Sequence, residues 1–232
     1  MEVKFISGKP ALVIDNVLVA GDMHIGLEEK LGSSGIHVDE LAASMGKELR
    51  SIFEYSGARS IALLGDIKES IGYPTKIERD HIRSFFEELE GIDISILKGN
   101  HDAHLHEILD MLKIKSNLYK ELLLEDAALL HGNAYPSEEA LEKRYIIVGH
   151  GHPAYKINGN VEKVWLVAKS SKLKSEFIIA PAFNPLKTGI DISAWTSDYM
   201  QLMRNGIFDF YTASIYSLDG TLIGRVKDLI QR

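Results

Sequence analysis

The chain lacks cysteine altogether among its 232 residues. A thiolate-bound metal site is therefore excluded, and the absence of cysteine fits a reducing compartment. Proline is also scarce, with six residues, and no Pro- or Ser-rich linker, internal repeat or low-complexity segment interrupts the chain. We therefore expect one domain over residues 1–232.

Long apolar runs are missing as well. No stretch approaches the roughly 20 residues of a membrane span, and Met1 to Lys4 show neither the basic region nor the apolar run of a secretory signal. We therefore expect a cytoplasmic protein without a membrane partner. The net charge of −7 disfavours unaided binding of long nucleic acid, which depends on Lys and Arg at the phosphates, but it leaves a local basic patch open.

What the sequence does contain is five short polar motifs, each directly after an apolar run. The runs cover residues 17–20, 61–64, 94–97, 127–130 and 145–148. The motifs that follow are Asp22-Met23-His24, Gly65-Asp66, Gly99-Asn100-His101-Asp102, His131-Gly132 and Gly149-His150-Gly151-His152. Short apolar runs bounded by Gly, Asn and Asp predict buried strands. Since open α/β sheets gather functional groups at the carboxyl ends of strands, the motifs predict one shared site.

Between the motifs lie stretches with helical periodicity. Apolar residues recur at helical spacing in 41–53, 77–89 and 105–112, which predicts helices packed on a sheet. Ser137 followed by two glutamates predicts another helix start. The alternation of strand and helix predicts parallel strands with helical crossovers.

The segment after His152 has a different character. Residues 161–168, 177–180, 206–216 and 221–226 are rich in β-forming residues and predict strands. Asp219-Gly220 between the last two predicts a tight hairpin turn. This half of the chain is therefore expected to supply a second, more antiparallel sheet.

The motifs hold seven potential metal ligands of mixed type. Carboxylates, an amide oxygen and imidazoles together suit Mn, Fe, Zn or Ni better than Ca. Seven ligands are too many for one tetrahedral ion, but they suit two ions that share a bridging carboxylate. Two ions about 4 Å apart lower the pKa of a shared water to near neutral and clamp the oxygens of an in-line displacement at phosphorus.

In this order the motifs resemble those of the calcineurin-like metallophosphoesterase superfamily, over residues 22–152. The resemblance implies an α/β fold of two packed mixed β-sheets flanked by helices, an αββα sandwich. It implies the following roles: Asp22, His24 and His152 bind a first metal, Asn100, His131 and His150 bind a second, and Asp66 bridges both. His101 matches the family histidine that binds no metal and faces the substrate, and Asp102 is expected to orient or charge its imidazole.

Two loops outside the ligand set each allow two interpretations. Residues 26–37 are either a mobile flap over the metals or a surface connection. Residues 181–189 resemble a loop in a small subgroup related to double-strand-break repair nucleases and ligase-associated phosphoesterases, some of which act on nucleic-acid ends or 2′,3′-cyclic phosphates. The same loop is equally well explained as a packed crossover. His37, His81, His104 and His106 match no motif of the family.

The resemblance implies a metal-dependent phosphoric ester hydrolase. We expect a phosphodiesterase for a nucleotide or nucleic-acid-derived substrate, with two Mn ions, and with Fe, Ni or Zn as alternatives. A Ser/Thr phosphatase is disfavoured, because no Arg stands shortly after Gly65-Asp66. At Glu69 the sequence departs from the family pattern, since many relatives have Asp there. A partner-assisted repair nuclease and a non-catalytic scaffold remain as alternatives, as do a protein partner and a homo-oligomer. The presence of His101 favours the enzyme.

Overall fold

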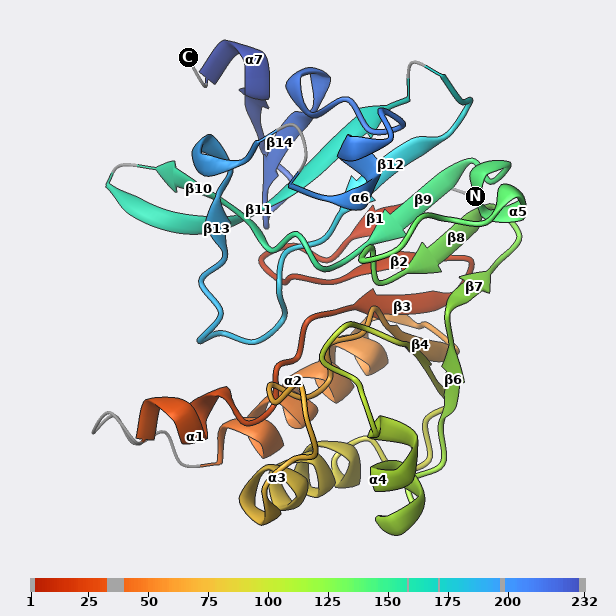
Figure 1. Ribbon diagram of the computed structural model, residues 1–232, viewed down its shortest axis with the longest axis vertical. Helices are drawn as coiled ribbons and strands as arrows, with labels where there is room; N and C mark the ends of the chain where they lie inside the picture. Colours follow the sequence, from red (N-terminus) through yellow and green to blue (C-terminus); the bar gives the residue numbers. More distant parts are fainter. Residues whose placement is uncertain (1–2, 33–39, 158, 171, 197–198, 230–232) are drawn as a thin grey trace.

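Two β-sheets lie one above the other in the computed structural model, with helices on the outside (Figure 1). The structure describes residues 3–32, 40–157, 159–170, 172–196 and 199–229. Within these ranges, no helix is long and apolar enough to cross a membrane. His37 and the second half of the expected flap lie outside the described residues.

The first sheet is built from the first half of the chain. Its strands, in spatial order, are β1 (Lys4–Phe5), β2 (Leu12–Ile14), β3 (Val17–Ala20), β4 (Ser60–Leu63), β5 (Ile94–Leu97) and β6 (Asn117–Tyr119). The strands β1 to β3 form an antiparallel meander, whereas β3 to β6 run parallel. The parallel strands therefore all end at the same edge of the sheet.

The second sheet is built from the rest of the chain. Its main path runs β13 (Ile190–Asp191), β10 (Pro153–Ile157), β11 (Asn160–Lys169), β12 (Glu176–Ile179), β9 (Tyr145–Val148), β8 (Ala127–Leu130) and β7 (Glu121–Leu123). A hairpin of β14 (Ser214–Ser217) and β15 (Leu222–Arg225) joins the other side of β11. The strands β8, β9 and β12 are parallel, so their carboxyl ends also share one edge.

Helices cover the outer face of the first sheet. They are α2 (Leu41–Ser56), α3 (Lys76–Glu87) and α4 (Leu105–Met111), while the short α1 (Leu27–Gly32) lies beside them (Figure 1). Thr75 begins α3 because its hydroxyl accepts the backbone N–H of Glu78 at 3.0 Å. Gly46 allows α2 and α3 to approach closely, since a Cβ there would lie 2.6 Å from the carbonyl oxygen of Phe85.

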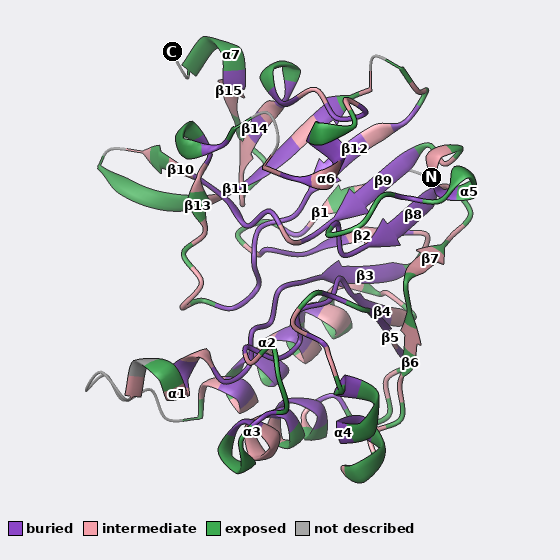
Figure 2. Ribbon diagram, in the orientation of Figure 1, coloured by how far each residue is buried: buried purple, intermediate pink, exposed green. Residues whose placement is uncertain are grey.

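Three apolar layers follow from this arrangement, and the strands are their most buried parts (Figure 2). One layer lies between the first sheet and its helices, and another lies outside the second sheet, under α6 (Gln201–Arg204) and α7 (Val226–Leu229). The middle layer joins the two sheets, for example through Val19, Leu64, Ile147 and Trp165. The two sheets are therefore packed face to face, and the predicted fold class is confirmed.

Most of the predicted elements are present. The five apolar runs form β3, β4, β5, β8 and β9, and the three amphipathic stretches form α2, α3 and α4. Ser137 caps α5 (Glu138–Leu141) by accepting the N–H of Ala140 at 3.1 Å. The hairpin turn at Asp219-Gly220 is confirmed, with Gly220 at φ +86°. Ile77 is the exception within its stripe, because 53% of it is exposed.

The prediction of a strand over residues 206–216 is wrong for most of its length. A 3-10 helix occupies Phe210–Thr212, and only the part from Ser214 onward joins the sheet. The carboxylate of Asp209 accepts the N–H of Tyr211 and so starts the helical turn. Ile207, Phe208 and Phe210 all pack into the outer layer, so their burial does not follow the two-residue alternation of a half-buried strand.

Candidate metal centre

The five polar motifs meet at one edge of the sandwich. Three of them follow β3, β4 and β5 of the first sheet, and two follow β8 and β9 of the second. Because these strands run parallel within each sheet, their carboxyl ends bring the five loops together. Side chains that are up to 130 residues apart, such as Asp22 and His152, thereby come into contact.

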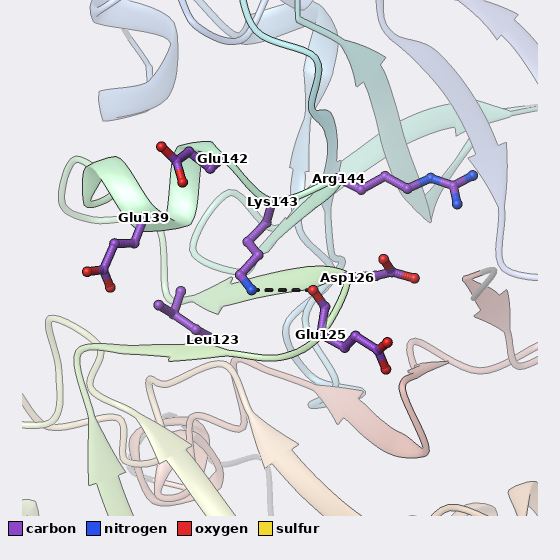
Figure 3. A pocket seen from close by; sticks show the side chains of 7 residues that line it. All are labelled: Leu123, Glu125, Asp126, Glu139, Glu142, Lys143 and Arg144. Carbon is purple, nitrogen blue, oxygen red and sulfur yellow. Dashed lines mark hydrogen bonds between the residues drawn. The ribbon is translucent and has the colours of Figure 1, made fainter.

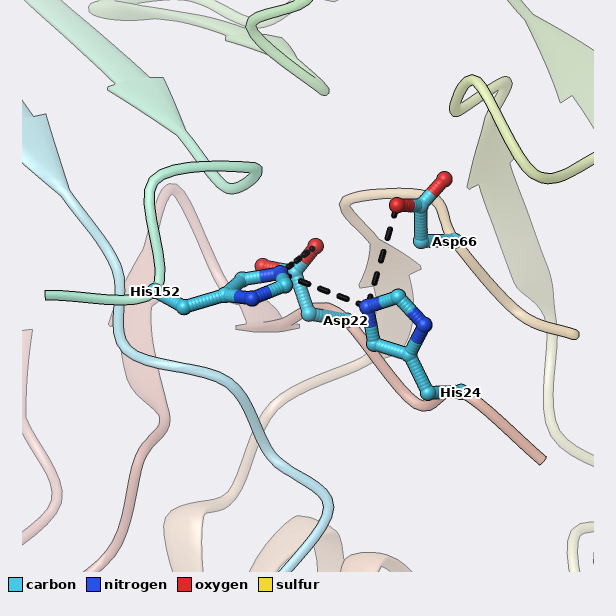
Figure 4. A group of neighbouring side chains, drawn as sticks. All are labelled: Asp22, His24, Asp66 and His152. Carbon is cyan, nitrogen blue, oxygen red and sulfur yellow. Dashed lines mark hydrogen bonds and ion pairs between the residues drawn. The ribbon is translucent and has the colours of Figure 1, made fainter. Parts of the chain in front are cut away.

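The first group of potential metal ligands is buried and consists of Asp22, His24, Asp66 and His152 (Figure 4). The Nε2 atom of His152 lies 3.0 Å from Oδ1 of Asp22. The Nε2 atom of His24 lies 3.3 Å from Nε2 of His152 and 3.7 Å from Oδ2 of Asp66. Imidazole nitrogens and carboxylate oxygens thus converge on one point, a donor set that suits a divalent transition metal.

The second group shares Asp66 with the first. The Nε2 atom of His131 lies 3.4 Å from the same Oδ2 atom of Asp66. It also lies 3.1 Å from Oδ1 of Asn100 and 3.1 Å from Nδ1 of His150. His131 is buried, whereas His150 is half-buried and Asn100 is exposed. The second group is therefore more accessible to solvent than the first.

Five of these side chains depend on an unusual backbone conformation. Positive φ angles occur at Asp22 (58°), His24 (42°), Asp66 (49°), His150 (64°) and His152 (45°). A non-glycine residue in this region costs about 1–3 kcal/mol, and such strain concentrates at functional sites. Backbone bonds hold the strained loops in place, among them the N–H of His24 to the carbonyl of Asp66 at 2.8 Å. These five are half of the ten described non-glycine residues with positive φ, so the strain is concentrated in the motifs.

Neighbouring acceptors fix the orientation of two of the imidazoles. The Nδ1 atom of His131 lies 2.7 Å from the carbonyl oxygen of Leu64, and Nδ1 of His24 lies 2.8 Å from Oε2 of Glu69. Each acceptor favours a ring proton on Nδ1, so Nε2 is the nitrogen of each ring that faces the site. Acceptors of this kind orient metal-binding histidines and raise their basicity.

His101 is positioned differently from the ligands. Its backbone N–H donates to Oδ1 of Asp66 at 2.9 Å, and its ring Nδ1 lies 2.6 Å from the carbonyl oxygen of Glu69. Its Nε2 atom lies 3.9 Å from Oδ2 of Asp66. The ring therefore presents Nε2 to the point where the two ligand groups join.

Asp102 does not touch the imidazole that it was expected to orient. Its two carboxylate oxygens accept the backbone N–H groups of Ile67 and Gly99, each at 2.9 Å. The ring nitrogen of His101 is bound instead by the carbonyl of Glu69. Asp102 thus links the loop that carries Asp66 to its own loop, and burial raises the pKa of its carboxyl group.

The charges in the site are strongly coupled. Burial acts to raise the pKa of Asp66, but its bond to His131 and the charge of that imidazole outweigh burial and hold the pKa well below its usual range. Burial acts to lower the pKa of His131, but Asp66 and Asp22 raise it to about 9. Burial and the charge of His131 lower the pKa of His150 to about 4. Without metal, the single positive charge of protonated His131 faces two ionised carboxylates, Asp22 and Asp66. The negative charge that is left over would be offset by a cation.

A cavity of about 390 Å³ opens above the ligands. Its lining includes site residues, among them Asn100, His101 and His150, together with Leu27, residues 186–190 and Tyr199. A hollow of about 550 Å³ lies elsewhere, before the amino ends of β8 and β9 (Figure 3). There Lys143 donates to the carbonyl of Leu124 at 2.7 Å, and no cluster of potential ligands is present among the described residues. Of these two cavities, only the smaller one is therefore lined by a cluster of potential metal ligands.

The sequence analysis missed several residues that support the site. The side-chain amide of Asn184 donates to the carbonyls of Met23 and His24, and Lys163 donates to the carbonyls of Ala182 and Asn184 at 2.7 and 2.6 Å. The loop 181–189 is thus packed against the first motif. Asn184 could have been found from the sequence, because it is the one polar residue among the apolar residues and prolines of 181–186. No feature of the sequence indicated a supporting role for Lys163.

The three unassigned histidines that the structure describes lie outside the two ligand groups. His81 pairs with the buried Glu28 at 2.8 Å and so connects α3 to α1. His104 and His106 are exposed and lie near Glu107. Residues 27–32 of the expected flap form α1, whose Lys30 reaches Glu69 at 2.7 Å.

The fold places the chain among the metallophosphoesterase-type sandwiches. Neither a known family model nor a curated protein matches its sequence. Among solved structures, nuclease MPE of Pseudomonas putida is similar over 96% of this chain and 100% of its own length, with a TM-score of 0.63 and 16% identity. The E. coli phosphoesterase YfcE covers 93% of this chain and 99% of its own, with a TM-score of 0.43 and 18% identity. A predicted phosphoesterase of Streptococcus pneumoniae TIGR4 covers 89% and 91%, with a TM-score of 0.34 and 12% identity.

The similarity to nuclease MPE extends over nearly the whole of both chains. It confirms the fold of the calcineurin-like metallophosphoesterases, which the order of the five motifs predicted.

Proposed function

We propose that this protein is a phosphoesterase that requires two divalent transition-metal ions and cleaves phosphodiesters of a nucleotide or nucleic acid. One observation carries the proposal. The Oδ2 atom of Asp66 is shared by two groups of ligands, at 3.7 Å from His24 and 3.4 Å from His131. A histidine that belongs to neither group, His101, faces the same oxygen.

The residues present fit two ions. Asp22, His24 and His152 would hold the first, Asn100, His131 and His150 the second, and Asp66 would join them. Such ions polarise a phosphoryl oxygen and lower the pKa of water to near neutral. Mn suits this mixture of oxygen and nitrogen donors, and Fe, Ni and Zn are the other candidates.

His101 would supply the acid. The carbonyl of Glu69 binds its Nδ1 atom, so Nε2 is the nitrogen that faces the reacting group. An imidazolium at this place stabilises the negative charge that develops on the phosphoryl group, and it donates a proton to the leaving oxygen. This role requires that the His101 ring keep its orientation when substrate binds. The hydrogen bond between its Nδ1 atom and the main-chain carbonyl of Glu69 holds the ring in that orientation.

The substrate class rests on two arguments. The cavity of about 390 Å³ is lined by Asn100 and His150 of the second ligand group and also by residues that are not candidate ligands, among them Leu186, Ile190 and Tyr199, which suits a diester with two organic groups. The similar solved structure belongs to a protein described as a nuclease. On the sequence alone, we also propose a single domain and a cytoplasmic location. A protein partner would be needed for work on long nucleic acid, because the chain carries a net charge of −7.

Hydrolysis of bis-p-nitrophenyl phosphate and p-nitrophenyl phosphate by chelator-stripped protein tests the proposal. Mn, Ni, Zn and Fe are added back in separate titrations. Turnover that returns with metal and favours the diester supports the proposal, whereas a preference for the monoester replaces it with a phosphatase. His101→Ala is the matched control, since it should retain both ions but lose turnover by orders of magnitude. No turnover with two bound ions, under any metal, would contradict the generic diesterase.

A further inference from the structure

Part of the lining of the cavity above the metal centre has no assigned role, and we call this part the second wall. It includes Leu186, Lys187, Ile190 and Tyr199. Lys187 lies close to the metal centre, because its Nζ atom is 3.6 Å from Oε2 of Glu69, the oxygen that faces Nδ1 of His24. Apart from Lys187 and Thr188, the second wall is apolar or aromatic.

The aromatic part of this wall is the end of a stack of three rings. Tyr199 lies on Trp195 with ring centroids 4.4 Å apart and an interplanar angle of 28°. Trp195 is fully buried and stacks in turn with Phe210 at 5.6 Å and 22°. Tyr199 is the member that reaches the cavity, where it is half-buried. Its ring is therefore supported from behind.

The wall is attached to the metal-binding loop at two points. The hydroxyl of Tyr199 donates to the carbonyl of Gly151 at 3.3 Å, and the N–H of Ile190 donates to the carbonyl of His152 at 2.9 Å. Gly189, at φ +91°, allows the second contact, since a Cβ there would lie 2.6 Å from the same carbonyl. The distance from the Tyr199 ring to the metal ligands is thus set by the main chain of one loop.

We propose that Leu186, Ile190 and Tyr199 form a subsite that binds the base of a nucleotide substrate by stacking, with its phosphate at the metal centre. The subsite rests on the proposed function and specifies its substrate. A supported aromatic ring binds any base, because every base presents a flat π-face. The cavity volume of about 390 Å³ lies in the lower part of the range for small-ligand sites, which suits a single nucleotide unit. Lys187, which lies beside Glu69 near the metal centre, would place a positive charge close to the phosphate.

Binding measured by calorimetry tests the subsite without catalysis. Metal-loaded protein is titrated with adenosine 5′-monophosphate and with ribose 5-phosphate, which differ only in the base. The wild type should bind the monophosphate that has a base more tightly, and Tyr199→Ala should reduce this preference by roughly five- to 150-fold. Tyr199→Phe should retain it, and Tyr55→Ala, at a tyrosine on α2 that is 81% exposed, should behave as wild type. Equal binding of both ligands by the wild type would overturn the subsite.

Kinetics then separate the subsite from the function. Thymidine 5′-(p-nitrophenyl phosphate) and methyl p-nitrophenyl phosphate release the same phenol, so only the group that remains on phosphorus differs. Tyr199→Ala should lower kcat/KM for the thymidine ester alone, and an equal loss on both would overturn the subsite while leaving the diesterase intact. If Tyr199→Ala does not fold, Ile190→Ser replaces it, since Ile190 is 42% exposed, and a smaller selective loss is expected. Base-dependent binding without any turnover would leave the subsite standing and contradict the function.

Discussion

Removal of the Asp102 carboxylate should lower the stability of the protein, whereas it should leave the orientation of the His101 ring unchanged. Both oxygens of Asp102 accept buried backbone N–H groups at 2.9 Å, from Ile67 and Gly99. Asp102→Ala leaves both donors unpaired, and each costs about 1–3 kcal/mol. Removing a buried charge returns part of this cost, so we expect about 2–4 kcal/mol of lost stability.

The isosteric change Asp102→Asn should cost less. Its amide retains one acceptor oxygen, but its NH₂ group faces the other backbone donor, so we expect about 1–3 kcal/mol. For a chain of this size each kcal/mol lowers Tm by about 2–4 °C, which gives about 4–16 °C for the alanine variant. Thermal unfolding of metal-free protein, followed by circular dichroism, measures both values.

The same two variants distinguish the role seen in the structure from the role expected from the sequence. If Asp102 acted by orienting His101, Asp102→Asn would lose turnover at an unchanged Tm and metal content. The smallest shift that we expect for Asp102→Ala is about 4 °C. A Tm within about 2 °C of the wild type would therefore refute our reasoning. Glu142→Ala serves as the control, because Glu142 is exposed and lies near the amino ends of β8 and β9, away from the candidate metal centre.

Three further predictions concern the support of the site. Glu69→Gln removes the charge that faces Nδ1 of His24 and should weaken metal binding about 10- to 100-fold, as measured by competition with a chelator; an unchanged affinity would exclude this role. Asp66 and Asp22 raise the pKa of His131 to about 9, so below that pH a metal must displace a proton from His131. Metal affinity should therefore rise with pH up to about 9, and a flat profile would argue against a proton there. Burial lowers the pKa of Lys163 to about 8. Folded protein then binds fewer protons than unfolded protein above that pH, so stability should rise between about pH 8 and 10; urea unfolding of Lys163→Met should lack this rise.

The parts of the fold that could be predicted are those with a strong local pattern. Runs such as residues 145–148 are continuously apolar, because β9 is buried on both faces between two parallel neighbours. The ligand motifs could be placed at the ends of such runs without knowledge of tertiary structure. Strands of two or three residues, such as β1 and β13, are too short to show a period and were missed.

The parts of the site that could not be predicted depend on contacts between distant segments. Asp102 directly follows His101 in sequence, but its carboxylate turns to the backbone of Ile67. The ring of His101, the partner expected for Asp102, is bound instead by the main-chain carbonyl of Glu69. Every residue has such a carbonyl, so the sequence does not show which one acts as the acceptor. Tyr199 reaches the cavity from an irregular segment after β13, where neither a strand nor a helix period gives its direction.

The central claim is that Asp66 joins two metal ions. Anomalous diffraction from a crystal of the protein soaked in Mn tests it most directly. We predict two peaks, one within bonding distance of Asp22, His24 and His152 and one within bonding distance of His131 and His150, both beside the carboxylate of Asp66. A single peak, or two peaks of which only one contacts Asp66, would contradict the account.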